Sequence, residues 1–144
     1  MDKLAQLGTT DLKLSRHGFG AARIGDGAPL SQIEKLLGSL LDLGITFIDT
    51  ADCYARSEDL IGRYLGGRSG DFVIATKCGC ISAGEEGEEY SSAVIERSID
   101  RSLQRMGLEC LDLVFLHTCS AEVLRDGEAV EALLRARDAG KVRY

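Results

Sequence analysis

A regular alternation between apolar runs and amphipathic segments is the feature that most constrains the fold of this chain. Four runs rich in apolar or β-branched side chains predict strands. These runs lie at residues 18–24, 45–48, 72–76 and 111–116. Apolar residues at helical spacing predict a helix between each strand and the next, and another after the last. The predicted helices lie at residues 31–41, 57–65, 92–106 and 128–139.

This alternation predicts an α/β fold with a parallel sheet and right-handed crossovers. Two architectures fit it: an open, doubly wound sheet, or parallel (β/α) units that form part of a (β/α)8 barrel. A polar turn at residues 9–11 lies between two short apolar segments and predicts a short N-terminal β-hairpin. With one proline and no linker-like stretch, residues 1–144 are predicted to form a single domain.

Side-chain patterns also predict which residues face the core. The run at residues 45–48 is almost wholly apolar, so we expect it to be buried on both faces of the sheet. In the last helix, Val130, Leu133 and Leu134 are expected to pack inward.

Net charge and hydropathy exclude several classes of partner. The formal net charge is −6 at pH 7, so we expect no general affinity for nucleic acid or for an anionic membrane. No apolar run approaches the roughly 20 residues of a membrane helix, and the first residues lack the apolar core of a signal peptide. The five cysteines, an odd number, indicate reduced thiols. We therefore expect a cytoplasmic protein.

Polar residues stand where three consecutive strands are predicted to end. Asp49, Lys77 and His117 follow their strands directly, and Tyr54 lies five residues beyond Asp49 in a predicted loop. Chemistry in parallel α/β folds gathers at the carboxyl ends of the strands, so we expect these four residues, called the tetrad here, to share one rim. Each has a structural explanation when taken alone. Asp49 can cap its strand, Lys77 can reach water, and His117 can be a core histidine.

The chemistry of the tetrad is coherent. A tyrosine is a poor acid at neutral pH, and a nearby ammonium group favours its phenolate form. A carboxylate paired with that ammonium would hold it in place. An imidazole can hydrogen-bond a carbonyl oxygen and help polarise it. Such a set could protonate a carbonyl oxygen while a cofactor delivers hydride to its carbon.

Four segments of the chain resemble the sequence signature of the aldo-keto reductase family. They are residues 44–58 with Gly62, residues 75–77, residues 111–117 and residues 140–144. The resemblance implies that Tyr54 is the general acid and that Asp49 and Lys77 tune it. It implies that His117 orients the substrate carbonyl. It also implies NADPH as the hydride donor, small aldehydes or ketones as substrates, and a place for Asp49 beside the nicotinamide ribose.

This chain departs from the family pattern in two ways. Ala55 stands where the family usually has glycine. The family also forms a full eight-stranded barrel, typically of about 250 residues. This chain supplies about four β/α units and the root of a fifth strand. The resemblance therefore implies parallel (β/α) units forming about half of a TIM (β/α)8 barrel, with most family cofactor contacts in the later half.

The sequence thus predicts an NADPH-dependent oxidoreductase that reduces aldehydes or ketones to alcohols. We expect the activity of this chain alone to be weak or absent, because hydride transfer needs a positioned nicotinamide. The alternative is a non-catalytic, self-associating half-barrel or binding module that retains the tetrad as a relic. Unpaired strand edges invite pairing with another chain, and a homodimer is one way to close the barrel.

Several cysteines are predicted to lie at the same rim as His117. They are Cys53, Cys78, Cys80 and Cys119. A thiolate–imidazole metal site is one interpretation. The spacings match no zinc pattern, so we favour small apolar packing residues and predict no metal.

Overall fold

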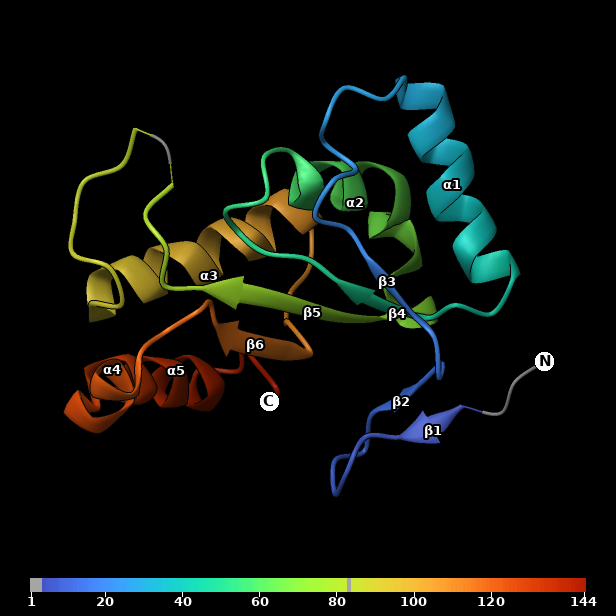
Figure 1. Cartoon of the computed structure of the whole chain (residues 1–144). Coiled ribbons are helices and arrows are strands. Elements are labelled where there is room, and N and C mark those ends of the chain that lie inside the picture. Colours follow the sequence, from blue (N-terminus) through green and yellow to red (C-terminus); the bar gives the residue numbers. More distant parts are fainter. Residues whose placement is uncertain (1–3, 83) are drawn as a thin grey trace.

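The computed structural model describes residues 4–82 and 84–144. Within them, the chain alternates strands and helices as the sequence predicts (Figure 1). The elements are β1 (Ala5–Gln6), β2 (Lys13–Leu14), β3 (Gly18–Gly20), α1 (Leu30–Asp42), β4 (Phe47–Asp49), α2 (Ser57–Leu65), η1 (Gly66–Asp71), β5 (Val73–Cys78), α3 (Ser92–Met106), β6 (Leu113–Leu116), α4 (Ala121–Asp126) and α5 (Glu128–Asp138). None of the helices in these ranges combines the length and apolar composition that crossing a bilayer requires.

The main sheet of the described residues has four parallel strands in the order β3-β4-β5-β6. Spatial order therefore follows chain order without a reversal, which is the pattern of a barrel and not of a doubly wound sheet. Leu111 and Val142 form a parallel β-bridge. The chain after α5 therefore begins a fifth strand position, next to β6. The fold is a set of parallel β/α units that forms about half of a TIM barrel.

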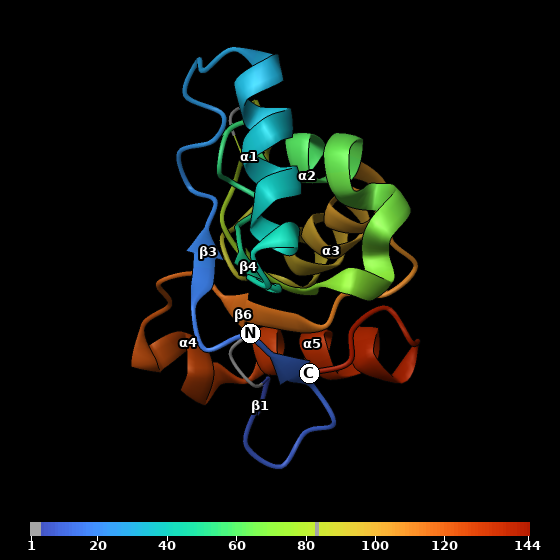
Figure 2. The same cartoon turned by 90° about the vertical axis from the view of Figure 1, so that its right-hand side faces the viewer.

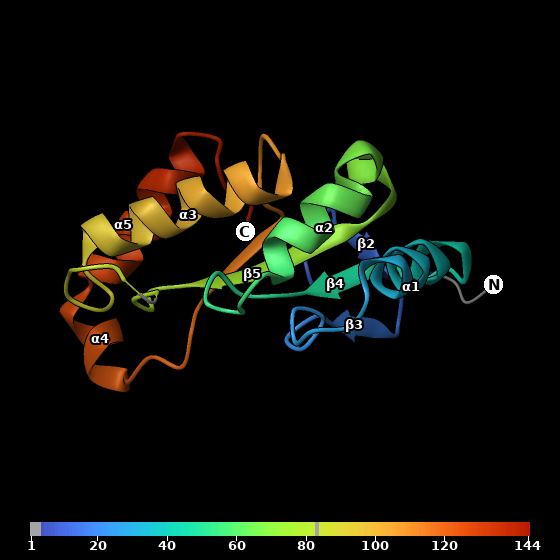
Figure 3. The same cartoon turned by 90° about the horizontal axis from the view of Figure 1, so that it is seen from above.

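The helices α1, α2, α3 and α5 cover one face of this sheet. Figure 2 shows α1, α2 and α3 gathered on the same side of the strands, and Figure 3 shows α5 beside α3. The core between these layers includes Ile48 and Ile74 from the strands and Leu37, Ile61 and Ile95 from the helices, each at most 1% exposed. Burial of these amphipathic stripes provides the main driving force for the β/α packing.

The predicted N-terminal hairpin is confirmed, and it covers part of the other face of the sheet. Ala5 pairs with Leu14 in an antiparallel register. Leu12 is buried in a second apolar cluster with Val73 and Leu113, and Leu14 packs against that cluster. The hairpin therefore closes one end of the surface that would be the interior of a barrel.

The expected double burial of residues 45–48 is wrong in part. Ile48 is fully buried under the helices, but Phe47 faces the opposite side of the sheet and is only half-buried. Phe115 in β6 is 49% exposed, and it lies on the same face as buried Leu113, because side chains alternate along a strand. Only the hairpin covers this face among the described residues, so the large side chains beyond its reach stay open to solvent.

The inward face of α5 also differs from the prediction. Val130 is 36% exposed and Leu134 is 42% exposed, and only Leu133 is partly buried. The residues that α5 buries are Ala129, Ala132 and Ala136. Small side chains permit a close approach between α5 and its neighbours, so the helix turns its alanines inward and leaves its larger apolar residues outside.

One glycine sets the contact between α2 and α3. A Cβ at Gly62 would overlap the carbonyl oxygen of Arg105 and lie 2.7 Å from the Cα of Met106. We expect Gly62→Ala to lower the free energy of unfolding by about 3 kcal/mol, because backbone atoms must move apart to admit the methyl group. Urea denaturation followed by circular dichroism measures the change.

Gly38→Ala in α1 is the matched control for this substitution. Open space surrounds a Cβ at Gly38, so alanine there is expected to stabilise the helix by about 0.5–1 kcal/mol. If the two variants changed the unfolding free energy in the same direction, the close approach at Gly62 would not limit the packing.

Candidate active site

The carboxyl ends of three neighbouring strands bring the tetrad to one rim. Asp49 is the last residue of β4, Lys77 lies near the end of β5, and His117 directly follows β6. The parallel registers align these ends: Asp49 is paired with Ala75, and the His117 N–H donates to the carbonyl of Cys78 at 2.9 Å. Position on the sheet, therefore, places the three polar side chains together.

Lys77 and Asp49 form an ion pair across neighbouring strands. The Lys77 ammonium donates to Asp49 Oδ1 at 2.6 Å and to the carbonyl oxygen of Thr50 at 2.9 Å. The side chain of Lys77 is 19% exposed and that of Asp49 is 37% exposed. Two charge-assisted hydrogen bonds at a half-buried site fix the position of the ammonium group.

Tyr54 reaches the same place from the loop that follows β4. Lys77 Nζ lies 5.1 Å from the centroid of the Tyr54 ring. The Tyr54 and His117 rings meet edge to face, with centroids 5.5 Å apart. The structure thus brings all four tetrad residues into one cluster, and their individual roles stay predictions.

The loop that carries Tyr54 bends sharply at the next residue. Ala55 has a φ of +35°, in the left-handed region that disfavours residues with a Cβ. Glycine at this position would adopt the conformation without that cost. This explains in physical terms why glycine suits the turn after Tyr54.

We expect Ala55→Gly to raise the free energy of unfolding by about 0.5–1 kcal/mol, because relief of the left-handed strain exceeds the extra entropy of the unfolded chain. Thermal or urea unfolding measures the change. Ala22→Gly is the control, since Ala22 lies in an exposed turn outside the positive-φ positions. The Ala22→Gly substitution is expected to lower the free energy of unfolding slightly. Equal changes in this free energy at the two sites would contradict backbone strain at Ala55.

A buried ionic network supports this loop from below. Asp52, with its side chain 1% exposed, accepts from Arg101 Nε at 2.7 Å and from Arg105 Nη1 at 3.0 Å. The Asp52 carboxylate also accepts a second hydrogen bond from Arg101 and one from the Ser98 hydroxyl group. Arg105 also donates to the carbonyl oxygen of Asp52 at 2.9 Å. The loop backbone is therefore anchored to α3 just before Cys53 and Tyr54.

Glu58, at the start of α2, is a second buried carboxylate of this network. It accepts hydrogen bonds of 2.7 Å from Thr76 Oγ1 and Ser102 Oγ, and Arg105 Nη1 lies 3.4 Å from its other oxygen. Burial raises the pKa of Glu58, and the hydrogen bonds from Ser102 and Thr76 oppose that shift. Glu58 thus joins α2 to β5 and α3 behind the tetrad.

Local sequence pattern does not predict this network. The signal for it lies in α3, where Ser98, Arg101, Ser102 and Arg105 recur at helical spacing. Such a polar stripe beside an apolar one usually faces solvent, so the pattern alone does not indicate burial. It becomes informative only once the loop after β4 is known to cross that face of α3.

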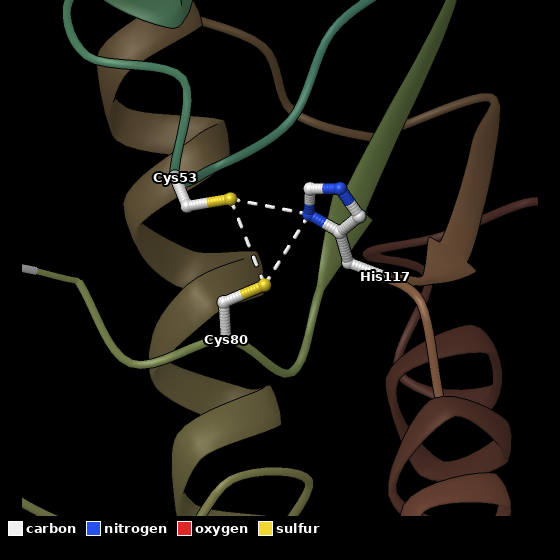
Figure 4. A group of neighbouring side chains, drawn as sticks. All are labelled: Cys53, Cys80 and His117. Carbon is white, nitrogen blue, oxygen red and sulfur yellow. Dashed lines mark hydrogen bonds between the residues drawn. The ribbon is translucent and has the colours of Figure 1, made fainter. Parts of the chain in front are cut away.

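Two thiols lie beside the imidazole of His117. Cys53 Sγ is 3.1 Å and Cys80 Sγ is 3.2 Å from His117 Nδ1, and the two sulfur atoms are 3.6 Å apart (Figure 4). Cys78 is different, because it is 2% exposed and packs in the core, where burial raises the pKa of its thiol to about 12. Of the cysteines predicted at the rim, Cys78 packs as a small apolar residue, and Cys53 and Cys80 approach the tetrad.

Several known proteins similar to this chain are oxidoreductases. The model of the aldo/keto reductase family matches residues 17–144. The chain is 33% identical over 144 residues to the oxidoreductase YqkF of Bacillus subtilis, covering 96% of this chain and 46% of that protein. It is 36% identical over 118 residues to the aldo-keto reductase yakc [NADP(+)] of Schizosaccharomyces pombe, covering 77% of this chain and 34% of that protein.

A solved structure has the same fold over the whole chain. The holo form of aldo-keto reductase AKR11C1 from Bacillus halodurans superimposes with a TM-score of 0.87 at 34% sequence identity, covering 100% of this chain and 49% of that one. The chain therefore spans about half the length of such relatives, and the match includes the rim that carries the tetrad. By its sequence and its β/α topology, this chain belongs to the aldo/keto reductase family.

Proposed function

We propose that this chain supplies the catalytic rim of an NADPH-dependent oxidoreductase that reduces small aldehydes or ketones to alcohols. The observation that carries the proposal is the tetrad cluster, in which the Lys77 ammonium is held 2.6 Å from Asp49 and 5.1 Å from the Tyr54 ring. The similarity to oxidoreductases, and to a relative whose name specifies NADP(+), supports the reaction and the cofactor.

Each member of the tetrad has a distinct role in this proposal. Tyr54 donates its hydroxyl proton to the carbonyl oxygen, and the Lys77 ammonium stabilises the phenolate that remains. Asp49 holds Lys77 in position. The imidazole N–H of His117 hydrogen-bonds the carbonyl oxygen and orients the carbonyl group. The cofactor, when bound, supplies the hydride that reaches the carbonyl carbon.

The rim has a group that fits the ribose of such a cofactor. The Asp49 side chain is 37% exposed at the carboxyl end of β4, and a carboxylate there can accept a hydrogen bond from a ribose hydroxyl. Lys77 beside it neutralises the charge of Asp49. Asp49 would then serve both Lys77 and the nicotinamide ribose.

A fusion protein tests the proposed reaction. Residues 1–144 replace the matching half of the Bacillus halodurans relative, and NADPH oxidation is followed with a panel of small aldehydes and ketones. We expect steady turnover by the fusion and much slower turnover by the 144-residue chain alone, because the reaction needs a positioned nicotinamide. A folded fusion that binds NADPH but reduces none of these carbonyls would refute the proposal.

The open face of the sheet supports a second proposal, that two copies of the chain associate. Phe115 is 49% exposed on this face and Phe47 is half-buried, so association would remove apolar surface from water. Light scattering is expected to give about twice the 15.5 kDa mass of one chain. A mass of one chain at micromolar concentration would contradict a homodimer, whereas a dimer without NADPH binding would favour the non-catalytic alternative.

A further inference from the structure

Three side chains of the types that bind metals, one of them the tetrad residue His117, converge from three consecutive β/α loops. Cys53 follows β4, Cys80 follows β5, and His117 follows β6. Figure 4 shows both sulfur atoms and His117 Nδ1 pointing toward one another. Their separations are 3.1, 3.2 and 3.6 Å, so the three atoms form a nearly regular triangle.

The size of this triangle matches the edges of a zinc coordination sphere. Tetrahedral Zn²⁺ with bonds of about 2.3 Å to sulfur and about 2.0–2.1 Å to nitrogen separates its ligand atoms by roughly 3.5–3.8 Å. The observed distances are within a few tenths of an ångström of these values. Two thiolates and an imidazole are also the ligand types that favour zinc over magnesium or calcium.

We propose that Cys53, Cys80 and His117 Nδ1 bind a Zn²⁺ ion with three protein ligands and an open fourth position. Metal binding deprotonates both thiols, so one Zn²⁺ enters and two protons leave. The two thiolate charges balance the charge of the ion, which suits a half-buried site. The sequence alone predicts no metal here, because the ligand spacings of 27 and 37 residues match no zinc motif.

The loops that carry the ligands are tied together without the metal. The Tyr90 hydroxyl donates to the carbonyl oxygen of His117 at 2.7 Å, and the Tyr90 N–H donates to the carbonyl of Gly79 at 3.0 Å. Gly79 packs directly against the Tyr90 ring, where a Cβ would collide. Tyr90 therefore holds the loop of Cys80 next to that of His117, and the ligand atoms are positioned in advance.

Burial of the Cys80 thiol affects the strength of metal binding. Desolvation and the neighbouring Cys53 raise the pKa of Cys80 to about 12, so its thiol carries a proton at neutral pH without the metal. Zn²⁺ must displace that proton, which lowers the apparent affinity but makes proton release a measure of binding. A thiolate bound to zinc is stable where a free thiolate is not.

Zinc at this site would also define the state of the imidazole. A histidine that binds metal through Nδ1 carries its ring proton on Nε2. That N–H is the donor that the proposed carbonyl reduction needs from His117. The zinc site shares His117 with the proposed reaction, but metal binding can be tested without any measurement of activity.

To test the site, the 144-residue chain is reduced with a phosphine and freed of metal with a chelator. It is then titrated with Co²⁺, which replaces Zn²⁺ as a spectroscopic probe. The Zn²⁺ affinity is measured by competition with the bound Co²⁺. We expect one ion per chain, thiolate-to-cobalt charge-transfer bands and release of two protons. Cys53→Ser and Cys80→Ser should each weaken binding at least 100-fold. Cys110→Ser is the matched control, because Cys110 precedes β6 and so lies at the end of the strand opposite to His117. The metal affinity of this variant should equal that of the wild-type chain.

X-ray absorption of the zinc-loaded wild-type chain keeps the proposal testable if a serine variant fails to fold. Two sulfur and two nitrogen or oxygen neighbours around zinc would support the site. A zinc ion with no sulfur ligand, the absence of stoichiometric binding, or unchanged affinity in folded Cys80→Ser would overturn it. A Cys53–Cys80 disulfide that persists under the phosphine would also overturn it and would identify the pair as a structural disulfide instead.

Discussion

Tyr54→Phe is expected to lower carbonyl reduction by the fusion protein about 10²–10⁴-fold while leaving NADPH affinity unchanged. The substitution removes only the hydroxyl group, which is the proposed proton donor. The ring remains, with its edge-to-face contact to His117 at 5.5 Å and its proximity to Lys77. The loss should therefore appear in kcat, because the proton is transferred in the transition state and not in substrate binding.

Tyr64→Phe is the matched control for this measurement. Tyr64 lies in α2 and packs against the core, so removal of its hydroxyl group leaves the rim intact. Turnover and NADPH affinity should stay close to wild type in this variant. Equal activity of the Tyr54→Phe and wild-type fusions would refute Tyr54 as the general acid, and a parallel loss of NADPH binding would assign it to the cofactor.

Asp52→Ala is expected to lower the free energy of unfolding by about 3–5 kcal/mol. The Asp52 side chain is 1% exposed and bonds both Arg101 and Arg105, whose side chains are 19% and 24% exposed. Alanine would leave Arg105 with Glu58, and Arg101 with the less buried Glu85, as their remaining carboxylate partners. Such a loss is a large part of the 5–15 kcal/mol typical of small domains, so urea denaturation should detect it clearly.

Asp100→Ala, also in α3, is the control for an exposed ion pair. Asp100 bonds Lys141 at 2.5 Å, but both side chains are about half exposed, at 57% and 43%. Solvent screens this pair, so its removal should cost no more than about 1 kcal/mol. If Asp52→Ala shifted the unfolding midpoint no further than Asp100→Ala, the buried network would not be what stabilises the loop of Tyr54.

Local pattern was sufficient to predict the parallel strands of the main sheet, the helices α1, α2, α3 and α5, and the rim. It did not predict α4 (Ala121–Asp126), and β3 ends at Gly20, before the predicted end of its strand at residue 24. The burial predicted for residues 72–76 is confirmed, because all five are buried, although the strand itself runs from Val73 to Cys78. Predictions of side-chain burial failed where burial depends on a distant part of the chain. Phe47 and Phe115 are apolar but half-buried or exposed, because the hairpin alone, among residues 4–82 and 84–144, covers their face of the sheet.

The sequence by itself determined the β/α order and the place of Asp49, Lys77 and His117 at the strand ends, since both follow from local periodicity and from the parallel direction of the strands. Only the tertiary structure decided which side chains meet across the loops. Asp52 reaches Arg101 over 49 residues, and Cys53 reaches His117 over 64. No sequence spacing encodes these contacts, because the path of each loop is set by packing against elements far away in the chain.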